Sequence, residues 1–264
     1  MAVAYARLLV AQARSQAQYR TSFAFDLAGS FLFAFVDLFG VVALFQVTRR
    51  LGGFDLLTSM MMASASACGF ALADLAVGSI ERMRLYVRSG LLDTVLVRPL
   101  GSLGQILAMD FAPRRIGRVL VTSSVFGICL HRADVPMTPA TATLVLLTPL
   151  AGSVLFGAIF VATATVAFWW IDSGEFANAM TYGGREFATY PLTVYGAGMR
   201  AAFGYAAGYA FTGYYPVLTL LGRPDPLGLP GWVGWCSPAV ALLAAVAAGA
   251  VWRTGVRHYR STGS

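Results

Sequence analysis

The sequence predicts an all-α integral membrane protein, and three observations point to this class. Hydrophobic residues make up 58% of the 264 residues, charged residues make up only 12%, and the mean hydropathy is +0.68. A soluble domain is usually about 45–50% apolar and about 25% charged. Several apolar stretches also have the length that a helix needs to cross about 30 Å of hydrocarbon.

The residue types exclude several kinds of catalytic site. All 19 basic residues are arginine, so the chain has neither the lysine of a phosphate-binding P-loop nor a Schiff-base lysine. The two histidines, His131 and His258, form no H-E-x-x-H motif. The three cysteines (Cys68, Cys129 and Cys236) are too far apart for a CxxC pair. We therefore expect no catalytic residue, metal site or cofactor on this chain.

The apolar stretches predict six membrane-spanning helices in a single domain. Residues 1–22 precede them as an amphipathic helix with Arg7 and Arg14 on one polar stripe, typical of a helix in the headgroup region. Five spans are predicted at residues 23–47, 54–80, 116–130, 140–170 and 232–252. The centre of the second span, residues 63–69, consists of small residues that permit close helix approach.

The remaining span has two candidates. Residues 173–195 are semi-polar, whereas residues 201–221 are more apolar but contain Pro216. Hydropathy alone favours residues 201–221. Either choice gives six crossings, with both termini on the same side of the membrane.

The arginine positions predict the orientation of the chain. With the N-terminus inside, three arginines lie in the N-terminal helix, seven in the segment 81–118 and three in the C-terminal tail. Four arginines lie in outside loops: Arg49, Arg50, Arg132 and Arg223. The placement of Arg185 and Arg200 depends on which candidate is the remaining span. Because arginines concentrate in cytoplasmic segments, both termini and the segment 81–118 are predicted to be cytoplasmic.

A short amphipathic helix is predicted within this cytoplasmic segment. Gly90 breaks one helix, Asp93 lies in the first turn of the next, and Pro99 ends it. The apolar face between them consists of Leu91, Leu92, Val95 and Leu96. Such a helix fits either a groove on a partner protein or the membrane surface, and the residues alone leave both open.

Two acidic residues lie inside predicted spans. Asp37 is near the middle of the first span, and Asp74 is in the inner third of the second. A carboxylate at membrane depth is costly, so each should face protein or water. Asp37 either lines a substrate path or bonds to a neighbouring helix. Asp74 is expected to pair with an arginine such as Arg82 or Arg115.

A G-x-x-x-G motif formed by Gly204 and Gly208 lies among tyrosines. The candidate pathway residues there are Tyr205, Tyr209 and Tyr215, in addition to Asp37. One interpretation is an outer gate at a dimer interface, where the glycines allow contact. The other is an aromatic belt at the membrane surface.

Residues 87–99 follow the pattern V-R-x-G-x-L-D-x-x-L-x-[KR]-P, which resembles the intracellular loop of type-two ABC exporter permeases. More narrowly, the chain resembles the bacterial branch of roughly 260-residue, six-helix permeases. Further matches occur in the same order and spacing along nearly the whole chain. They include Phe168-Trp169-Trp170, Glu186-Phe187, Tyr190-Pro191, Phe211, Pro216 and Leu220-Leu221-Gly222-Arg223.

The resemblance implies a permease without catalysis, powered by a separate cytoplasmic ABC ATPase dimer that binds ATP and Mg²⁺. A second permease, identical or similar, would complete the pathway. The resemblance also implies that residues 81–115 form a coupling region whose short helix docks into the ATPase. The implied docking residues are Gly90, Leu91, Leu92, Asp93, Leu96, Arg98 and Pro99.

The resemblance also favours residues 173–195 as the fifth span, with an Arg185–Glu186 ion pair inside it. A re-entrant element on the outer face would then cover residues 198–221, with Pro216 at its break, because broken backbone at membrane depth is tolerated when protein buries it.

We therefore expect an exporter subunit of the bacterial inner membrane for a hydrophobic or amphipathic substrate such as a drug, natural product or lipid. Membrane lipid is an expected partner and nucleic acid is not. The alternative is a proton-coupled secondary transporter that uses Asp37 and Asp74. The absence of a hydropathy repeat, which many such transporters have, counts against that alternative.

Overall fold

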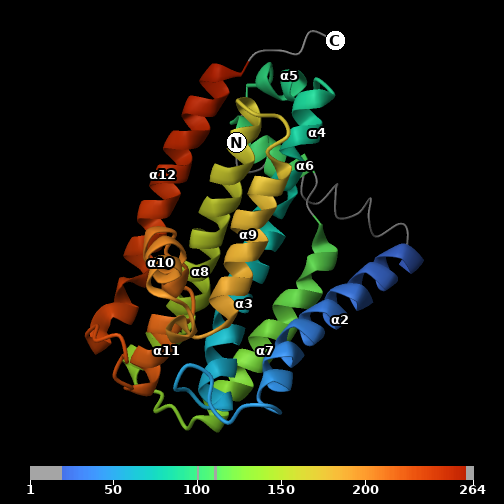
Figure 1. Cartoon of the computed structure of the whole chain (residues 1–264). Helices are drawn as coiled ribbons and strands as arrows, with labels where there is room; N and C mark the ends of the chain where they lie inside the picture. Colours follow the sequence, from blue (N-terminus) through green and yellow to red (C-terminus); the bar gives the residue numbers. More distant parts are fainter. Residues whose placement is uncertain (1–19, 100, 110–111, 260–264) are drawn as a thin grey trace.

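The computed structural model describes residues 20–99, 101–109 and 112–259, and helices dominate these residues, which confirms the all-α class. The body consists of six long helices (Figure 1): α2 (Arg20–Leu44), α3 (Leu56–Val77), α7 (Ile116–Arg132), α8 (Pro139–Thr165), α9 (Gly174–Thr189) and α12 (Ser237–His258). The amphipathic helix predicted for residues 1–22 lies almost wholly outside the described residues.

A helix occupies each of five predicted span regions and residues 173–195. Four have the length and hydropathy of a membrane crossing: Phe23–Leu44, Leu56–Arg88, Pro139–Phe168 and Gly231–His258. α7 and α9 are shorter, at 17 and 16 residues. The α2–α3 and α7–α8 connections lie at one end of the molecule, whereas the α8–α9 turn and the C-terminal end of α12 lie at the other (Figure 1). The long helices therefore alternate in direction.

The segment between α9 and α12 is broken into short pieces. It contains α10 (Ala197–Met199), the π-helical segment Arg200–Ala206, a 3-10 turn over Tyr209–Phe211 and α11 (Tyr214–Leu221). The alternative span over residues 201–221 is therefore wrong, because no continuous helix covers it. The break predicted at Pro216 is wrong as well. Pro216 lies in the first turn of α11, where its missing N–H breaks no helical hydrogen bond, and the backbone turns at Gly208, whose φ is +82°.

α3 lies at the centre of the bundle and packs against α7, α8 and α9. A Cβ added to Gly69 of α3 would lie 3.0 Å from the backbone of Gly152 in α8. The two backbones therefore meet directly, as the small residues 63–69 predict. The Ser66 and Thr212 hydroxyls, 2.9 Å apart, join α3 to the broken segment.

Three short helices follow α3 at the other end of the bundle: α4 (Met83–Arg88), α5 (Leu91–Leu96) and α6 (Ser102–Met109). Gly90 separates α4 from α5 with φ +68°, a conformation that favours glycine. α5 buries Leu92 and Val95. The Gln105 side chain of α6 donates a hydrogen bond of 3.2 Å to the Val95 carbonyl oxygen. The predicted break and the short helix after it are thus confirmed, and α6 holds that helix in place.

Candidate functional site

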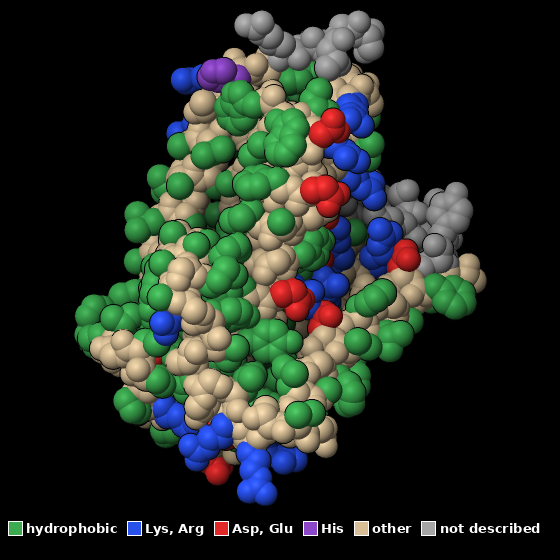
Figure 2. All heavy atoms as spheres, in the orientation of Figure 1, with side chains coloured by type: hydrophobic (Ala, Val, Ile, Leu, Met, Phe, Trp, Pro, Cys, Tyr) green, Lys and Arg blue, Asp and Glu red, His purple; other side chains and the backbone are tan. Residues whose placement is uncertain are grey.

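Charged side chains gather along a hollow between α2 and the body of the bundle (Figure 2). α2, α3, α7, α9 and the turn before α7 contribute them. We call this set the charged groove: Asp26, Asp37, Asp74, Arg114, Arg115, Arg118, Arg185 and Glu186. Ionisable groups at membrane depth are costly, so such a concentration marks the strongest candidate site of the molecule.

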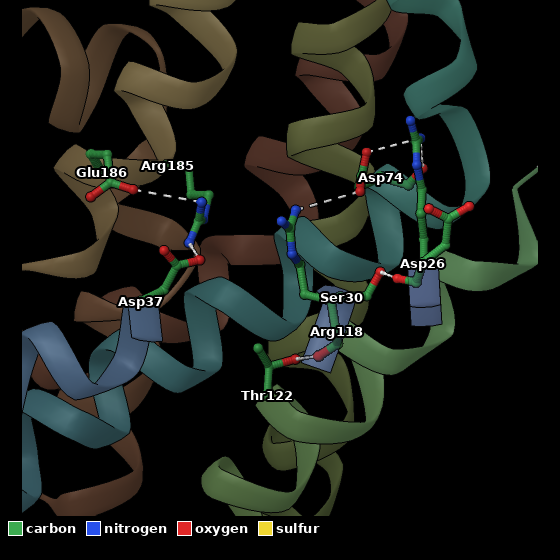
Figure 3. Close-up of polar contacts among 9 residues, drawn as sticks. Asp26, Ser30, Asp37, Asp74, Arg118, Thr122, Arg185 and Glu186 are labelled. Atoms are coloured by element: carbon green, nitrogen blue, oxygen red, sulfur yellow. Dashed lines mark hydrogen bonds and ion pairs between the residues drawn. The ribbon is translucent and has the colours of Figure 1, made fainter. Parts of the chain in front are cut away.

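Asp37 and Arg185 meet in the groove, where α2 approaches α9 (Figure 3). The Arg185 Nη2 atom donates to Asp37 Oδ2, while Nη1 lies 3.6 Å from Glu186 Oε1. The guanidinium also lies over the Phe70 ring, 5.2 Å from its centroid. Asp37 thus forms an ion pair with a neighbouring helix, in line with one of the two interpretations of this residue. The expected Arg185–Glu186 ion pair is also present. The sequence did not indicate Arg185 as the partner of Asp37.

Asp74 is held by two arginines from the start of α7. Arg115 Nη1 lies 2.9 Å from Asp74 Oδ1, and Arg118 Nη1 lies 3.5 Å from Asp74 Oδ2. Arg115 also donates a 2.7 Å hydrogen bond to the Asp74 carbonyl oxygen. The expected pairing with Arg115 is confirmed. Arg118 was missed, although its i, i+3 spacing from Arg115 places both side chains on one face of a helix.

The Arg115 guanidinium fits against α3 because residue 78 is glycine. A Cβ at Gly78 would lie 1.9 Å from Arg115 Nη1 and 2.3 Å from Asp74 Oδ1. Any side chain at this position would therefore displace the ion pair. The glycine requirement is a packing constraint that hydropathy and motif spacing do not reveal.

A polar cavity of about 210 Å³ opens beside these ion pairs. It is lined by Ser30, Asp74, Arg114, Arg115, Arg118 and Tyr182. Arg114 Nη1 donates a 3.2 Å hydrogen bond to Asp26 Oδ2 of α2. The cavity therefore lies between this ion pair and the ion pairs of Asp74 with Arg115 and Arg118. Tyr182 of α9 hydrogen-bonds Glu81, which lines a second cavity of about 200 Å³ toward α4. Polar surface thus follows α9 from its first turn to Arg185.

The residues predicted to dock an ATPase divide into an exposed and a buried set. Leu91 and Leu96 are 39% and 37% exposed, Val97 is 83% exposed, and Arg98 and Pro99 are exposed too. Leu92 is 0% exposed. The expectation that Leu92 contacts a docked protein is therefore corrected, since its side chain is buried within this chain and anchors α5. Val97 also belongs to the exposed set, although it was not among the implied docking residues.

The C-terminal end of α12 lies close to α5. Burial, followed by the nearby Asp93 carboxylate, raises the pKa of the Tyr259 phenol. The Phe168 ring packs against both Trp252 and Tyr259, with centroids 5.5 and 5.8 Å apart. The half-buried Asp93 thus faces Tyr259 of the same chain, and α5 is supported from the α12 side as well.

The tyrosines near the G-x-x-x-G motif lie mainly inside the subunit. Tyr209 is 1% exposed and donates a hydrogen bond to the Met180 carbonyl oxygen. Tyr215 is also buried, with its hydroxyl 3.0 Å from that of the partly exposed Tyr205. A Cβ at Gly204 would lie 2.7 Å from Leu192, so this glycine serves packing within the chain. Among the three tyrosines, Tyr205 has the surface that a substrate or partner could reach.

Within the part of the chain that the structure describes, no cluster of three His, Cys, Asp or Glu side chains could hold a metal ion. A sequence profile of ABC-2 family transporter proteins matches residues 31–263. This range contains α5, Asp37, Asp74 and all six long helices except the start of α2. No curated protein and no solved structure matches the chain. Because the match covers most of its length, this membrane protein belongs to the ABC-2 family of transporters.

Proposed function

We propose that this chain is the permease subunit of an ATP-driven exporter and forms half of a pathway for a hydrophobic or amphipathic substrate. In this proposal α2, α3, α7, α8, α9 and α12 cross the bacterial inner membrane, and both termini lie in the cytoplasm. Family membership, the alternating direction of the helices and the arginine distribution support it.

The observation that carries the proposal is the exposed apolar surface of α5. Leu91, Leu96 and Val97 project from a short helix at the arginine-rich end of the bundle. Exposed apolar side chains on a helix of this length suit a groove on a partner. Leu92 and Val95 are buried and α5 packs against α6, so force applied to the exposed face would reach the membrane domain. A cytoplasmic ABC ATPase dimer is the proposed partner, and ATP and Mg²⁺ bind there.

An ion pair provides a route from α4 and α5 to the charged groove. Arg88, the last residue of α4, pairs with Asp172 in the turn before α9. α9 in turn carries Arg185, which contacts Asp37 of α2. Movement of the docking helix would therefore shift α9 relative to α2. We propose that this movement opens and closes the groove toward the substrate.

The groove is open along one side of the subunit, so a second permease would have to cover it. Ala34 and Leu38 of α2 and Ala67 of α3 line the same hollow as Asp37 and Arg185, which places apolar and charged surface side by side. Such a surface suits an amphipathic substrate. We therefore place the pathway between two permeases, identical or similar, with Asp37 and Tyr205 as candidate contacts.

The proton-coupled alternative is less well supported. A proton-carrying acid must lose its charge during the cycle. Asp37 and Asp74 both contact guanidinium groups, which stay charged at all physiological pH values. These contacts argue against proton transfer by either acid in the state described.

Co-purification with an ATPase tests the proposal. The tagged permease would be co-expressed with the ABC ATPase encoded beside it and purified in detergent. Wild type should retain the ATPase, and a Leu91→Arg/Leu96→Arg variant should lose it. The control Met137→Arg changes a side chain that is 60% exposed at the opposite end and should retain it. Transport by well-folded permease without any ATPase would instead establish the secondary transporter.

A further inference from the structure

We propose that the cavity beside Arg114, Arg115 and Arg118 binds the phosphate headgroup of an anionic phospholipid from the cytoplasmic leaflet. The cavity is the 210 Å³ space between α2, α7 and α9 described above. This site would regulate or stabilise the permease whatever the transported substrate is. It therefore does not depend on the proposed export function.

The charge balance of the cavity favours an anion. Three of the residues that line the cavity are arginines, and Asp74 is the acidic residue among them. Asp26 pairs with Arg114, and Glu81 beside Tyr182 interacts with Arg115 and Arg118, so the nearby carboxylates are shared among several guanidinium groups. The positive charge of the lining persists at every physiological pH because all three basic groups are arginines.

The geometry of the three arginines also leaves donors for a ligand. Each of their ion pairs with Asp26 and Asp74 uses the Nη1 atom. A guanidinium has five N–H donors in a planar fork, so donors on Nη2 and Nε remain for the oxygens of a phosphate. The side chains of Arg114 and Arg118 are 38% and 21% exposed, so both remain accessible from the cavity.

The cavity has room for a ligand much larger than a single water. One water needs about 10–15 Å³ of such space, and the cavity offers about 210 Å³. A phosphate with part of its glycerol can therefore enter without displacing the helices. Arginine-lined pockets between membrane helices on the cytoplasmic side are suited to anionic headgroups.

The position of the cavity fits a lipid better than a free anion. Asp74 lies in the last turn of α3 and Arg118 in the first turn of α7, both near the end that carries α4 to α6. α2 leans away from the bundle at this end (Figure 1), so the hollow opens sideways. The bounding helices expose Phe31, Ile116 and Leu120. These apolar side chains offer a surface on which the acyl chains can lie.

Native mass spectrometry of the full-length permease in detergent would test this site. Phosphatidylglycerol, phosphatidylethanolamine or inorganic phosphate would be added to separate samples. Wild type should bind phosphatidylglycerol about tenfold more tightly than phosphatidylethanolamine. The Arg114→Gln/Arg118→Gln variant keeps the Arg115–Asp74 pair and should lose this preference. The control Arg49→Gln/Arg50→Gln removes the same charge from the opposite end and should keep it.

Thermal unfolding and gel filtration would check that each variant is folded. If the double variant does not fold, the single Arg114→Gln variant would be used in its place. Equal phosphatidylglycerol binding by the cavity variant and the control would overturn the proposal. Binding of inorganic phosphate with no preference between the lipids would also overturn it, because the site would then take a free anion.

Discussion

Arg185 of α9 contacts Asp37 of α2 across the charged groove and joins the two helices that border it. Arg185 is 12% exposed and also approaches Glu186 and the face of Phe70. Asp37 is 33% exposed, and Arg185 is the partner that the structure shows for its carboxylate. The pair is therefore asymmetric, because Arg185 keeps other contacts when Asp37 is removed but Asp37 loses its counter-charge when Arg185 is removed.

This asymmetry predicts different effects of the two single substitutions. Arg185→Gln should destabilise the permease by about 1–3 kcal/mol, since it leaves a carboxylate unpaired in the membrane domain. Asp37→Asn should cost less. The double variant should be more stable than the sum of the two effects implies. Thermal unfolding in detergent measures all three, and additive effects would show that the two side chains do not interact.

The same variants separate the two transport mechanisms. An ATP-driven permease should retain at least part of its transport in the double variant, because the charges are removed as a pair. A proton-coupled carrier that uses Asp37 should lose transport in Asp37→Asn regardless of residue 185. Substrate uptake into inverted vesicles, with ATP or with a proton gradient, distinguishes these outcomes.

Much of the helical arrangement could be predicted from the sequence because hydropathy and glycine placement are local signals. The apolar stretch 140–170 predicts α8 with its 3-10 end, and Gly90 predicts the start of α5. Hydropathy misled at residues 201–221, because an apolar stretch buried inside the protein looks the same as a spanning helix. The left-handed backbone of Gly208 breaks that stretch, and sequence pattern does not show which glycine takes it.

The site could be predicted only in part, because its contacts join distant segments. Arg115 was expected beside Asp74 since both lie near the end predicted to be cytoplasmic, but the Asp37–Arg185 contact spans 148 positions. The apolar face of α5 was expected, yet which of its leucines points outward depends on where α6 packs. Leu92 was expected to dock a partner but is buried and anchors α5, whereas Leu91 and Leu96 are exposed as expected.

Gly78 should not tolerate a side chain. In Gly78→Ala the new Cβ would overlap Arg115 Nη1 and push it from Asp74, so stability should fall by about 1–3 kcal/mol. Gly127→Ala is the matched control, because nothing lies within 4 Å of its added Cβ and alanine favours the helix. Melting temperatures in detergent would compare them. A Gly78→Ala protein as stable as wild type would mean that Arg115 has another position of similar energy.

The anchoring and docking roles of α5 should separate in two alanine variants. Leu92→Ala empties a fully buried site and should destabilise the packing of α5 by about 2 kcal/mol or more. Hydrogen exchange of residues 91–96 should then accelerate. Leu96→Ala should leave exchange unchanged but weaken retention of the ATPase. The roles would have to be reversed if Leu96→Ala accelerated exchange and Leu92→Ala left both properties unaffected.

Arg88 and Asp172 should contribute to coupling more than to stability. Their side chains are 51% and 66% exposed, and an exposed ion pair is worth about 0–1 kcal/mol. Arg88→Asp or Asp172→Arg alone should leave the melting temperature near that of wild type but lower the amount of substrate transported per ATP hydrolysed. The exchanged pair Arg88→Asp/Asp172→Arg restores the attraction and should recover the wild-type amount of transport per ATP hydrolysed.

The control changes a similarly exposed ion pair at the opposite end of the bundle. Arg223→Asp or Asp55→Arg should leave the transport per ATP hydrolysed unchanged. The exchanged Arg88–Asp172 pair restores the attraction between the two side chains. If transport per ATP hydrolysed nevertheless stayed low in this variant, charge attraction would not couple α4 to α9, and the coupling would have to depend on the packed side chains instead.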